Sequence, residues 1–164
     1  MSEICQFDVF SMTMFLYLFC HHVVKISVYA LGTMKKHKPK KHKLRLRHLT
    51  LDDYDNLAVL MEHVYDNLGG AWKKEQYVSQ ITRFQQGQIV IEDNGVLVAA
   101  ALSMVVDYYR FGDVHTYAQI TGEGYLTHHD PDGDTLYGVD IFVHPKYRGL
   151  RLGRRLYDAR KELC

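Results

Sequence analysis

From residue 44 onward, the spacing of apolar and polar residues predicts alternating strands and helices. Residues 44–49, LRLRHL, alternate apolar with basic side chains, which is typical of a half-exposed strand. Thr50 and Asp53 have the spacing of a capping box, and apolar residues then recur at helical spacing as far as Gly69–Gly70. Because glycine commonly follows the last turn of a helix, we predict that this first helix ends there.

A second helix and a β-hairpin are predicted next. The helix covers about residues 73–85 and would bury Tyr77, Ile81 and Phe84. The hairpin joins QIVIED to VLVAAALSMVVD through Asn94–Gly95, a pair that favours a type I′ turn. The second arm is continuously apolar, which is typical of a strand covered on both faces.

The last third of the chain contains a less regular insert, a strand and a helix. Residues 117–126, YAQITGEGYL, can form a further pair of strands, and residues 128–134, HHDPDGD, form a polar turn. Residues 135–143, TLYGVDIFV, predict a central strand. The helix that follows would bury residues at spacings of four, three and four, namely Leu152, Leu156, Ala159 and Leu163. The fold class is therefore α/β (α+β).

Residues 1–34 do not continue this pattern. Val9 to Val24 is apolar enough for a signal peptide or a short membrane anchor, but Glu3 and Asp8 precede it instead of Lys or Arg. The run is also short for a bilayer, which needs about 20 apolar residues. Two interpretations stay open: a real anchor, and an upstream extension of a protein that begins at Met34.

The charge of the chain is uneven, although its formal value is only +1. Eight of the 20 Lys and Arg residues lie between Lys35 and Arg47, where there is no acid. Such a run can bind nucleic acid or anionic lipid. It lacks interleaved aromatic residues and its second half merges into a strand. We therefore interpret residues 35–43 as a solvated basic arm and expect neither nucleic-acid nor membrane binding.

The cysteines and the acidic turn give little support to a metal or redox centre. Cys5, Cys20 and Cys164 form no C-x-x-C pair, and an odd, scattered count fits a reducing, cytoplasmic compartment. The acids of residues 130–134 start with the spacing of a calcium loop, but Thr135 stands where glycine is expected and Ile141 where the closing acid is expected. His128 and His129 as zinc ligands are the weaker alternative. We expect no metal.

The junction between the last strand and the last helix has the character of an anion site. The first turn of a helix carries N–H groups without intrahelical partners, and the helix dipole adds positive charge there. Gly149 and Gly153 allow close approach of an anion, and four arginines surround it: Arg148, Arg151, Arg154 and Arg155. The alternative is a plain connection with solvated arginines. Neither the nucleoside triphosphate motif G-x-x-x-x-G-K-[ST] nor the dinucleotide motif G-x-G-x-x-G is present.

The run IFVHPKYRGLRLGRRLYD, residues 141–158, resembles the acetyl-coenzyme-A loop of the GNAT acyltransferase superfamily. That loop reads Gln or Arg, two residues, Gly, one residue, and Gly or Ala. Arg148 matches the first position and Gly153 the last, whereas Arg151 replaces the middle glycine. The order of predicted elements from Leu44 also agrees. The resemblance implies a mostly antiparallel central sheet flanked by helices, in a domain over residues 44–164.

The same resemblance implies the binding residues. Main-chain amides of the loop would bind the coenzyme pyrophosphate, and the preceding strand would pair with the pantetheine arm. These residues are Ile141, Phe142, Val143, Arg148, Gly149, Leu150, Arg151, Leu152, Gly153 and Arg154. The family continues with another strand, a helix and a hairpin that often carries a tyrosine acid. We therefore expect this chain to be a fragment, inactive alone.

Residues 116–145 also resemble the acetyltransferase module of bacterial proteins that continue into a carbon–nitrogen hydrolase domain. The resemblance implies transfer of acetyl from coenzyme A to a primary amine, and an attached hydrolase as a possible partner. Amine attack needs a proton acceptor, because free amines of the lysine type have a pKa near 10.4. Asp140 is the first candidate, on the strand face opposite Val139, Ile141 and Val143, and Glu123 and His144 are weaker ones.

Two other functions stay open from the sequence. One is a non-catalytic acyl-coenzyme-A sensor that regulates an attached hydrolase through the same loop. The other is a nucleic-acid-binding protein that uses the basic arm. For Asp140 the alternative is a structural carboxylate that pairs with an arginine or caps nearby backbone.

Overall fold

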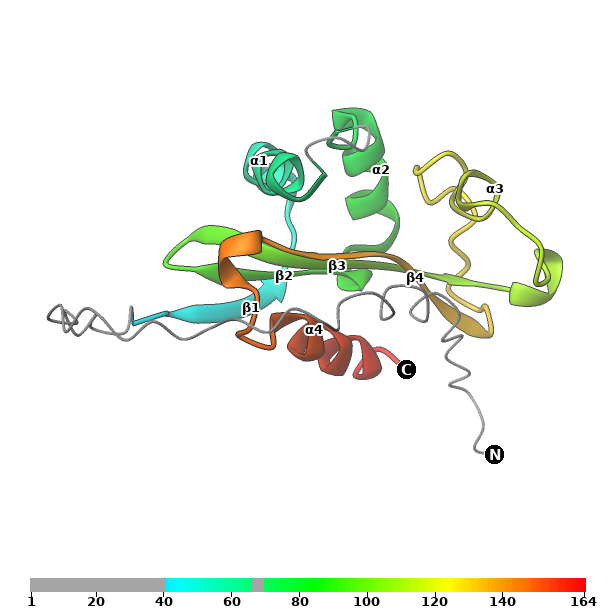
Figure 1. Cartoon of the computed structure of the whole chain (residues 1–164). Coiled ribbons are helices and arrows are strands. Elements are labelled where there is room, and N and C mark those ends of the chain that lie inside the picture. The colour runs from blue at the N-terminus through cyan, green and yellow to red at the C-terminus, as the bar shows by residue number, and fades with distance from the viewer. Residues whose placement is uncertain (1–40, 66–69) are drawn as a thin grey trace, which may run out of the picture. The chain divides into compact units, whose positions relative to one another are not determined.

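The computed structural model of the chain describes residues 41–65 and 70–164 (Figure 1). The predictions for residues 1–34, for most of the basic arm and for the glycine stop at Gly69 lie outside the described residues. Within these residues, no helix combines the length and the apolar character needed to cross a bilayer.

An antiparallel sheet of four strands, in the order β1-β2-β3-β4, forms the centre of the described fold (Figure 1). The strands are β1 (Leu44–His48), β2 (Gln88–Asp93), β3 (Val96–Val106) and β4 (Thr135–Val143). Asn94 and Gly95 join β2 to β3 with positive φ angles of 52° and 85°, so the predicted hairpin turn is confirmed. β4 was expected to be central, but among the described residues it pairs with β3 alone.

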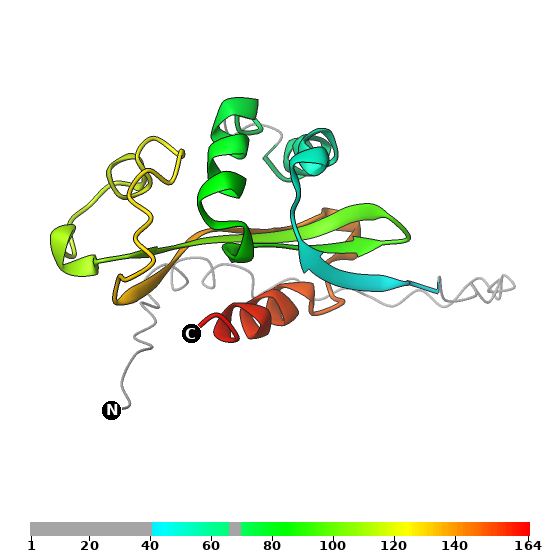
Figure 2. The ribbon, with the colours of Figure 1, turned by 180° about the vertical axis from the view of Figure 1, so that it is seen from behind.

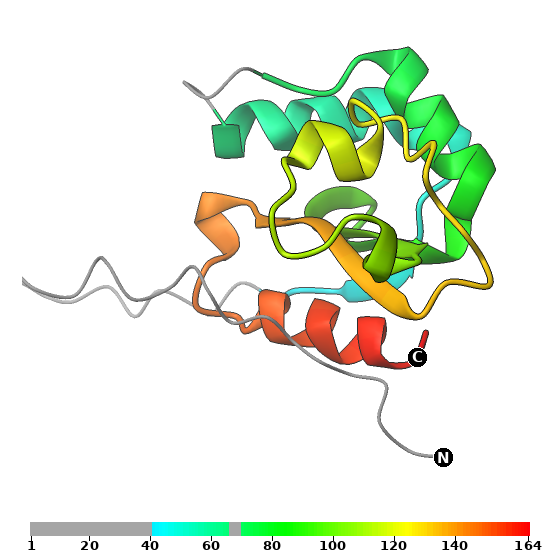
Figure 3. The same cartoon turned by 90° about the vertical axis from the view of Figure 1, so that its right-hand side faces the viewer.

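Helices cover both faces of this sheet. α1 (Tyr54–Tyr65), α2 (Lys74–Phe84) and α3 (Tyr117–Thr121) lie on one face, and α4 (Leu152–Lys161) lies on the other (Figures 1 and 2). Figure 3 shows the sheet between these two helical layers. The predicted mixed fold with a mostly antiparallel sheet is confirmed. Short 3-10 turns complete the chain: η1 (Leu51–Asp53), η2 (Gln85–Gly87), η3 (Tyr108–Arg110) and η4 (Pro145–Tyr147).

The alternation along β3 divides its apolar residues between two cores. Ala100, Leu102 and Met104 pack with residues of α1, α2 and α3, whereas Ala99 and Ala101 pack under α4 with Leu152 and Leu156. This explains the continuous apolar run, since each face of the strand is buried. A fully buried side chain of leucine size contributes about 1.5–3 kcal/mol, so both layers depend on this strand.

A β-bulge interrupts the pairing of β3 with β4. Leu102 pairs with Asp140 but Ser103 pairs with Gly138, so Val139 is the extra residue. Ile141 and Val143 lie on the α4 face as predicted. Val139 instead packs with Phe142 among the residues beneath α1 and α2, on the side of Asp140. Its predicted place opposite Asp140 is wrong, because an extra residue breaks the two-residue period of the strand.

The prediction of a strand pair over residues 117–126 is also wrong. Thr116 caps α3 by accepting a hydrogen bond from the Gln119 N–H at 3.2 Å, and Gln119 completes the capping box. Gly122, with φ of 60°, ends the helix. Buried Ile120 joins the core of α1 and α2. The capping residues therefore determine that this segment is helical, although its alternating pattern favoured strands.

The last residue of the basic run, Arg47, is paired with acids. Arg47 donates to both carboxylate oxygens of Asp53, at 2.7 and 2.8 Å, and to Glu92 at 2.8 Å. Hydrogen bonds from Arg47 lower the pKa of Asp53 to about 2. The predicted first strand is thus joined to the capping box of the first helix by an ion pair. The same Asp53 also accepts from the main chain and side chain of Thr50.

Candidate coenzyme and acyl-transfer site

The chain turns sharply between β4 and α4. His144 caps η4 by accepting the Lys146 N–H at 3.1 Å, and Pro145 occupies the first position of that turn, where its missing N–H costs nothing. The Tyr147 hydroxyl then donates to Asp93 at 3.0 Å, and His42 lies against the same carboxylate at 2.8 Å. The loop therefore starts from a point fixed to the β2–β3 hairpin.

The loop itself has a left-handed backbone at two positions. Gly149 has φ of 85° and Arg151 has φ of 57°. Glycine adopts such angles without strain, whereas any other residue pays about 1–2 kcal/mol. Arg151 stands where the GNAT pattern has its middle glycine, so the structure gives a backbone reason for glycine there. In this chain the backbone keeps the left-handed conformation at this position, although the residue is arginine and not glycine.

Five main-chain N–H groups at this turn donate to no other residue that the structure describes. They belong to Gly149, Arg151, Leu152, Gly153 and Arg154. The N–H groups of Arg148 and Leu150 are used within η4 and the loop, and that of Arg155 begins the regular helical bonding. A cluster of unpaired N–H groups at the start of a ten-residue helix forms an anion site, reinforced by the helix dipole.

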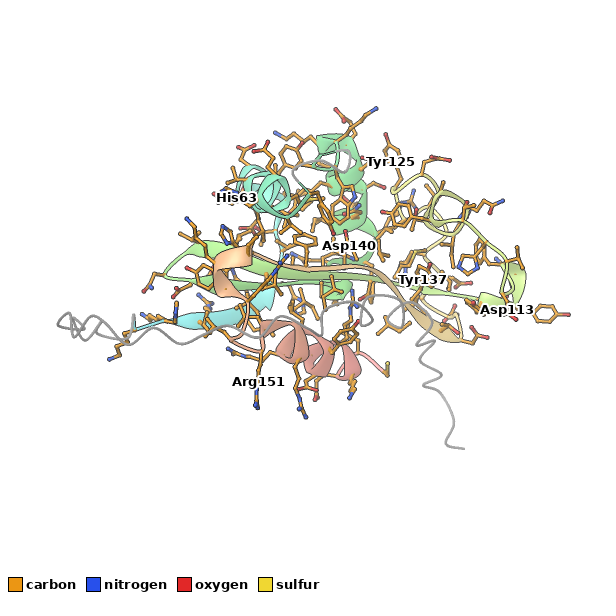
Figure 4. All side chains as sticks on the ribbon, viewed as in Figure 1. His63, Asp113, Tyr125, Tyr137, Asp140 and Arg151 are labelled. Atoms are coloured by element: carbon orange, nitrogen blue, oxygen red, sulfur yellow. The ribbon has the colours of Figure 1, made fainter. Side chains whose placement is uncertain are left out.

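The space and the charge around these groups fit a diphosphate. A Cβ atom added at Gly149 or at Gly153 would meet no described atom within 4 Å, so the approach to the loop is open. The first turn of α4 contains no acid, and four exposed arginines surround it: Arg148, Arg151, Arg154 and Arg155. Figure 4 shows Arg151 on the α4 side of the sheet, directed away from the core. Donors, space and charge all favour an anionic group.

β4 leads to this loop along the sheet edge. Among the described residues the strand pairs only with β3, so the outer main-chain groups of the segment 141–143 face no other strand. Ile141 and Val143 are half-buried on the α4 face, while Phe142 is buried on the other face. An extended ligand arm that leaves the loop can therefore form main-chain hydrogen bonds along this edge.

Asp140 lies on β4 at the bulge, on the face of the three helices (Figure 4). Its Oδ1 accepts the hydroxyl of Tyr65 from α1 at 2.7 Å and the N–H of Ile141 at 2.8 Å. Burial raises the pKa of Asp140, while the bonds from Tyr65 and Ile141 and the charge of Arg160 oppose the rise. A carboxylate with a raised pKa is a stronger base when ionised. Burial and the bond to Asp140 also raise the pKa of Tyr65 far above its usual value.

Residues 57–164 match the model of the acetyltransferase (GNAT) family, a range that includes most of α1, the strands β2 to β4, the loop and α4. The chain belongs to the GNAT family. The resemblance inferred from the loop is thereby confirmed. GNAT proteins are acyltransferases that use acetyl-CoA or another acyl-CoA as co-substrate.

Two relatives from Bacillus subtilis (strain 168) are similar to this chain. The probable hydrolase YhcX is 36% identical over 122 residues, which are 74% of this chain and 24% of YhcX. The uncharacterized N-acetyltransferase YkwB is 32% identical over 123 residues, which are 73% of this chain and 54% of YkwB. The GNAT chain therefore spans about a quarter and about half the length of these curated relatives.

Solved structures show the same fold at low sequence identity. The loading GNATL domain of CurA from Lyngbya majuscula superposes with a TM-score of 0.63 and 22% identity, covering 74% of this chain and 58% of that one. The GNAT-like decarboxylase GphF, in complex with isobutyryl-CoA, superposes with a TM-score of 0.56 and 24% identity, covering 71% and 56%. The GNAT architecture is thus shared across these proteins.

The other sequence candidates lie away from Asp140. Glu123 follows α3, is exposed, and offers its carbonyl to Gln76 on α2 at 2.7 Å. His144 acts as the cap of η4, and its ring lies 4.9 Å from that of His63. Neither is bonded to Asp140.

The HHDPDGD segment forms the predicted polar turn. The Asp132 N–H donates to Asp130, and the main-chain N–H of Tyr108 donates to Asp134. His129 accepts the Val105 N–H at 3.1 Å and stacks on Phe84. Within the described part of the chain, no three His, Cys, Asp or Glu side chains are grouped so as to hold a metal ion.

Three site residues of this GNAT chain could not be found from the sequence pattern. Tyr65 lies 75 residues before its partner Asp140. The apolar spacing of α4 predicts an amphipathic helix but gives no role to Arg160. Asp93, which holds Tyr147, ends a strand where an acid is ordinary. Each acts through a long-range contact, and a local pattern carries no signal for such pairs.

Proposed function

We propose that this protein transfers an acetyl group from acetyl-CoA to a primary amine. The observation that carries the proposal is the cluster of five unpaired N–H groups on the loop between β4 and α4. Main-chain donors from Gly149 to Arg154 bind the coenzyme pyrophosphate, and the arginine side chains add charge around it. The main chain of residues 141–143 pairs with the pantetheine arm along the free edge of β4.

Asp140 is the proposed base. Bound acetyl-CoA would supply an activated thioester; the amine nitrogen bonds to its carbonyl carbon, the C–S bond breaks, and coenzyme A leaves as the thiol, which takes up the proton that the amine loses. An amine attacks only when it is neutral, and an amine of the lysine type has a pKa near 10.4. The ionised carboxylate of Asp140 removes the proton of the acceptor, directly or through water. Tyr65 holds this carboxylate in place from α1.

Two measurements test the proposal. Calorimetric titration should show binding of acetyl-CoA and CoA to the full chain, with weaker binding of adenosine alone. Because we expect residues 1–164 to be inactive alone, acetyl transfer is measured, here and below, on this chain extended by the further elements of the GNAT fold. Incubation of that protein with acetyl-CoA and a panel of primary amines, followed by mass spectrometry, should then detect an acetylated acceptor. Mass detection is preferable to thiol reagents because the thiol of Cys164 is exposed. Failure to bind either coenzyme would contradict the proposal.

A second candidate function is a non-catalytic acyl-CoA sensor attached to a carbon–nitrogen hydrolase. The relative called a probable hydrolase favours it, because this chain corresponds to only 24% of that protein. Coenzyme binding without acetylation of any amine in the panel would support the sensor. A cytoplasmic location is part of both proposals and is supported by three cysteines without a C-x-x-C spacing.

A further inference from the structure

Arg160 lies beneath the β-bulge, on the face of the sheet opposite the Asp140 carboxylate. It comes from the last turn of α4 and is only 7% exposed. Its Nη2 donates to the carbonyl oxygen of Leu102 at 2.5 Å and to the carbonyl oxygen of Asp140. Leu102 and Asp140 are the paired residues at which the register shifts. One nitrogen thus joins the two strands at the bulge.

This arrangement is costly, because the guanidinium is buried and the acidic side chains of the described residues form no ion pair with it. Its Nε has no partner among the described atoms, and burial lowers the pKa of the side chain. Arginine nevertheless stays protonated in proteins, so a positive charge remains in the core. Gly138 leaves the room for it, since a Cβ atom there would lie 3.1 Å from Arg160 Nη1. Buried charges without a partner are expensive, and hydrophobic residues often replace them without loss of stability.

The bulge and the charge both act on Asp140. Asp140 directs its carboxylate to Tyr65 on α1, and Arg160 bonds the carbonyl of the same residue from the other side. The titratable groups that face Asp140 are Tyr65 from α1, Tyr117 from α3 and Arg160 from α4. Two of them are neutral phenols at neutral pH. Arg160 is the charged group among them, and its charge favours the ionised carboxylate.

We propose that Arg160 is a positioning residue, which holds the bulge in place through its bonds to Leu102 and Asp140 and places a buried positive charge behind Asp140. This role rests on the proposed function, in which Asp140 is the base. Arg160 touches no reacting group in this scheme and acts only through the main chain and the charge of Asp140.

The test compares Arg160→Gln, Arg160→Lys and the control Lys161→Gln in the full chain. Gln keeps an N–H₂ group for the carbonyls and removes the charge, whereas Lys keeps both charge and donors. Lys161 is the next residue on α4, and its side chain is 58% exposed. Carboxyl ¹³C NMR, with the Asp140 signal assigned by Asp140→Asn, follows the titration of Asp140 without any acyl transfer.

We expect Arg160→Gln to raise the pKa of Asp140 and to move the acid limb of the transfer rate to higher pH. Arg160→Lys should restore both toward the original values, and Lys161→Gln should change neither. Acetyl-CoA affinity should stay within about threefold in all three, which is under 1.4 kcal/mol.

An Asp140 titration that is the same in Arg160→Gln and in the original chain overturns the proposal. If Arg160→Gln does not fold, the carboxyl titration of Arg160→Lys decides, because a pKa unlike the original value contradicts a role of the charge. Normal transfer by Asp140→Asn would instead refute the proposed function and leave the NMR result standing.

Discussion

The proposed coenzyme loop, residues 148–154, and the surroundings of Asp140 are built in opposite ways. The loop consists of consecutive residues, is exposed, and offers main-chain N–H groups whose chemistry does not depend on the side chain. Asp140 is half-buried and is held by Tyr65 from α1 and Arg160 from α4, which lie 75 residues before and 20 residues after it. Yet both sites belong to one strand and the turn that follows it.

This difference determines which changes each site tolerates. At the loop, replacing one charged side chain leaves the main-chain N–H donors in place. A larger side chain at the point where the ligand approaches these donors would instead exclude the ligand. At Asp140, removing one oxygen or one hydroxyl changes the chemistry while the backbone stays. A substitution at one site should therefore leave the other intact, and the predictions below test this independence.

The largest effect is expected for Asp140→Asn. Asn removes the base but keeps an oxygen that accepts from Tyr65 and Ile141, so the fold should persist. General base catalysis contributes about 10²–10⁴-fold, and the rate of acetyl transfer should fall by that amount. The affinity for acetyl-CoA should not change.

Stability gives a control for this variant. Burial raises the pKa of Asp140 above its unfolded value, so the ionised form destabilises the fold as pH rises through that pKa. Loss of the charge should leave stability at neutral pH the same or higher, as measured by urea unfolding. Unfolding of Asp140→Asn at neutral pH would show that the carboxylate has a structural role instead.

Gly153→Val should abolish coenzyme binding. A Cβ atom at this position would meet no described atom within 4 Å apart from its chain neighbours and its own helix, so the fold should accept valine. A diphosphate that approaches the N–H groups of this turn should instead collide with the added side chain. We expect at least about a hundredfold loss in calorimetric affinity, or 2.7 kcal/mol. The NMR titration of Asp140 should be unchanged.

Arg155→Val is the matched control for this prediction. It places the same side chain on the same helix and removes a charge, but the Arg155 N–H already donates to Arg151 at 3.2 Å. Affinity should fall by less than tenfold. If Arg155→Val weakens binding more than Gly153→Val does, the site depends on arginine side chains and not on the main chain.

The same contrast explains what the sequence could predict. The loop, the Asn94–Gly95 turn and the helices α1, α2 and α4 depend on neighbouring residues, and the local pattern located them. Residues 117–121 were misread because Thr116 and Gly122, which cap the helix, outweigh an alternating pattern. The bulge at Val139 left no local signal, since it is defined by the register of β4 against β3.

Asp140 itself could be nominated, but its environment could not. Its position on the strand that leads to the loop follows from the sequence order. Its contacts with Tyr65 and Arg160 arise from helices that pack on opposite faces, and their distance along the chain hides them. For the same reason the direction of its pKa could not be obtained from the sequence.

A smaller effect is expected for Tyr65→Phe. The hydroxyl stabilises the ionised carboxylate, so its loss raises the pKa of Asp140 further. The acid limb of the transfer rate should move to higher pH, with a nearly unchanged rate at the alkaline plateau. Loss of the hydrogen bond should cost about 1 kcal/mol of stability in urea unfolding. A profile that does not move would show that the Asp140 carboxylate does not limit the rate.

The smallest effect is expected for Arg151→Gly, which restores the middle glycine of the GNAT pattern. The left-handed angle of 57° at this position costs an arginine about 1–2 kcal/mol, while glycine adds about 0.5–1 kcal/mol of unfolded-state entropy. The free energy of unfolding should therefore stay the same or rise by up to about 1.5 kcal/mol. One exposed charge is worth about 0–1 kcal/mol, so acetyl-CoA affinity should stay within about tenfold. Urea unfolding and calorimetry measure the two quantities on one sample. A large loss of affinity with unchanged stability would mean that Arg151 binds the coenzyme through its guanidinium. The loop would then depend on side chains, as the surroundings of Asp140 do, and the two sites would no longer differ in this respect.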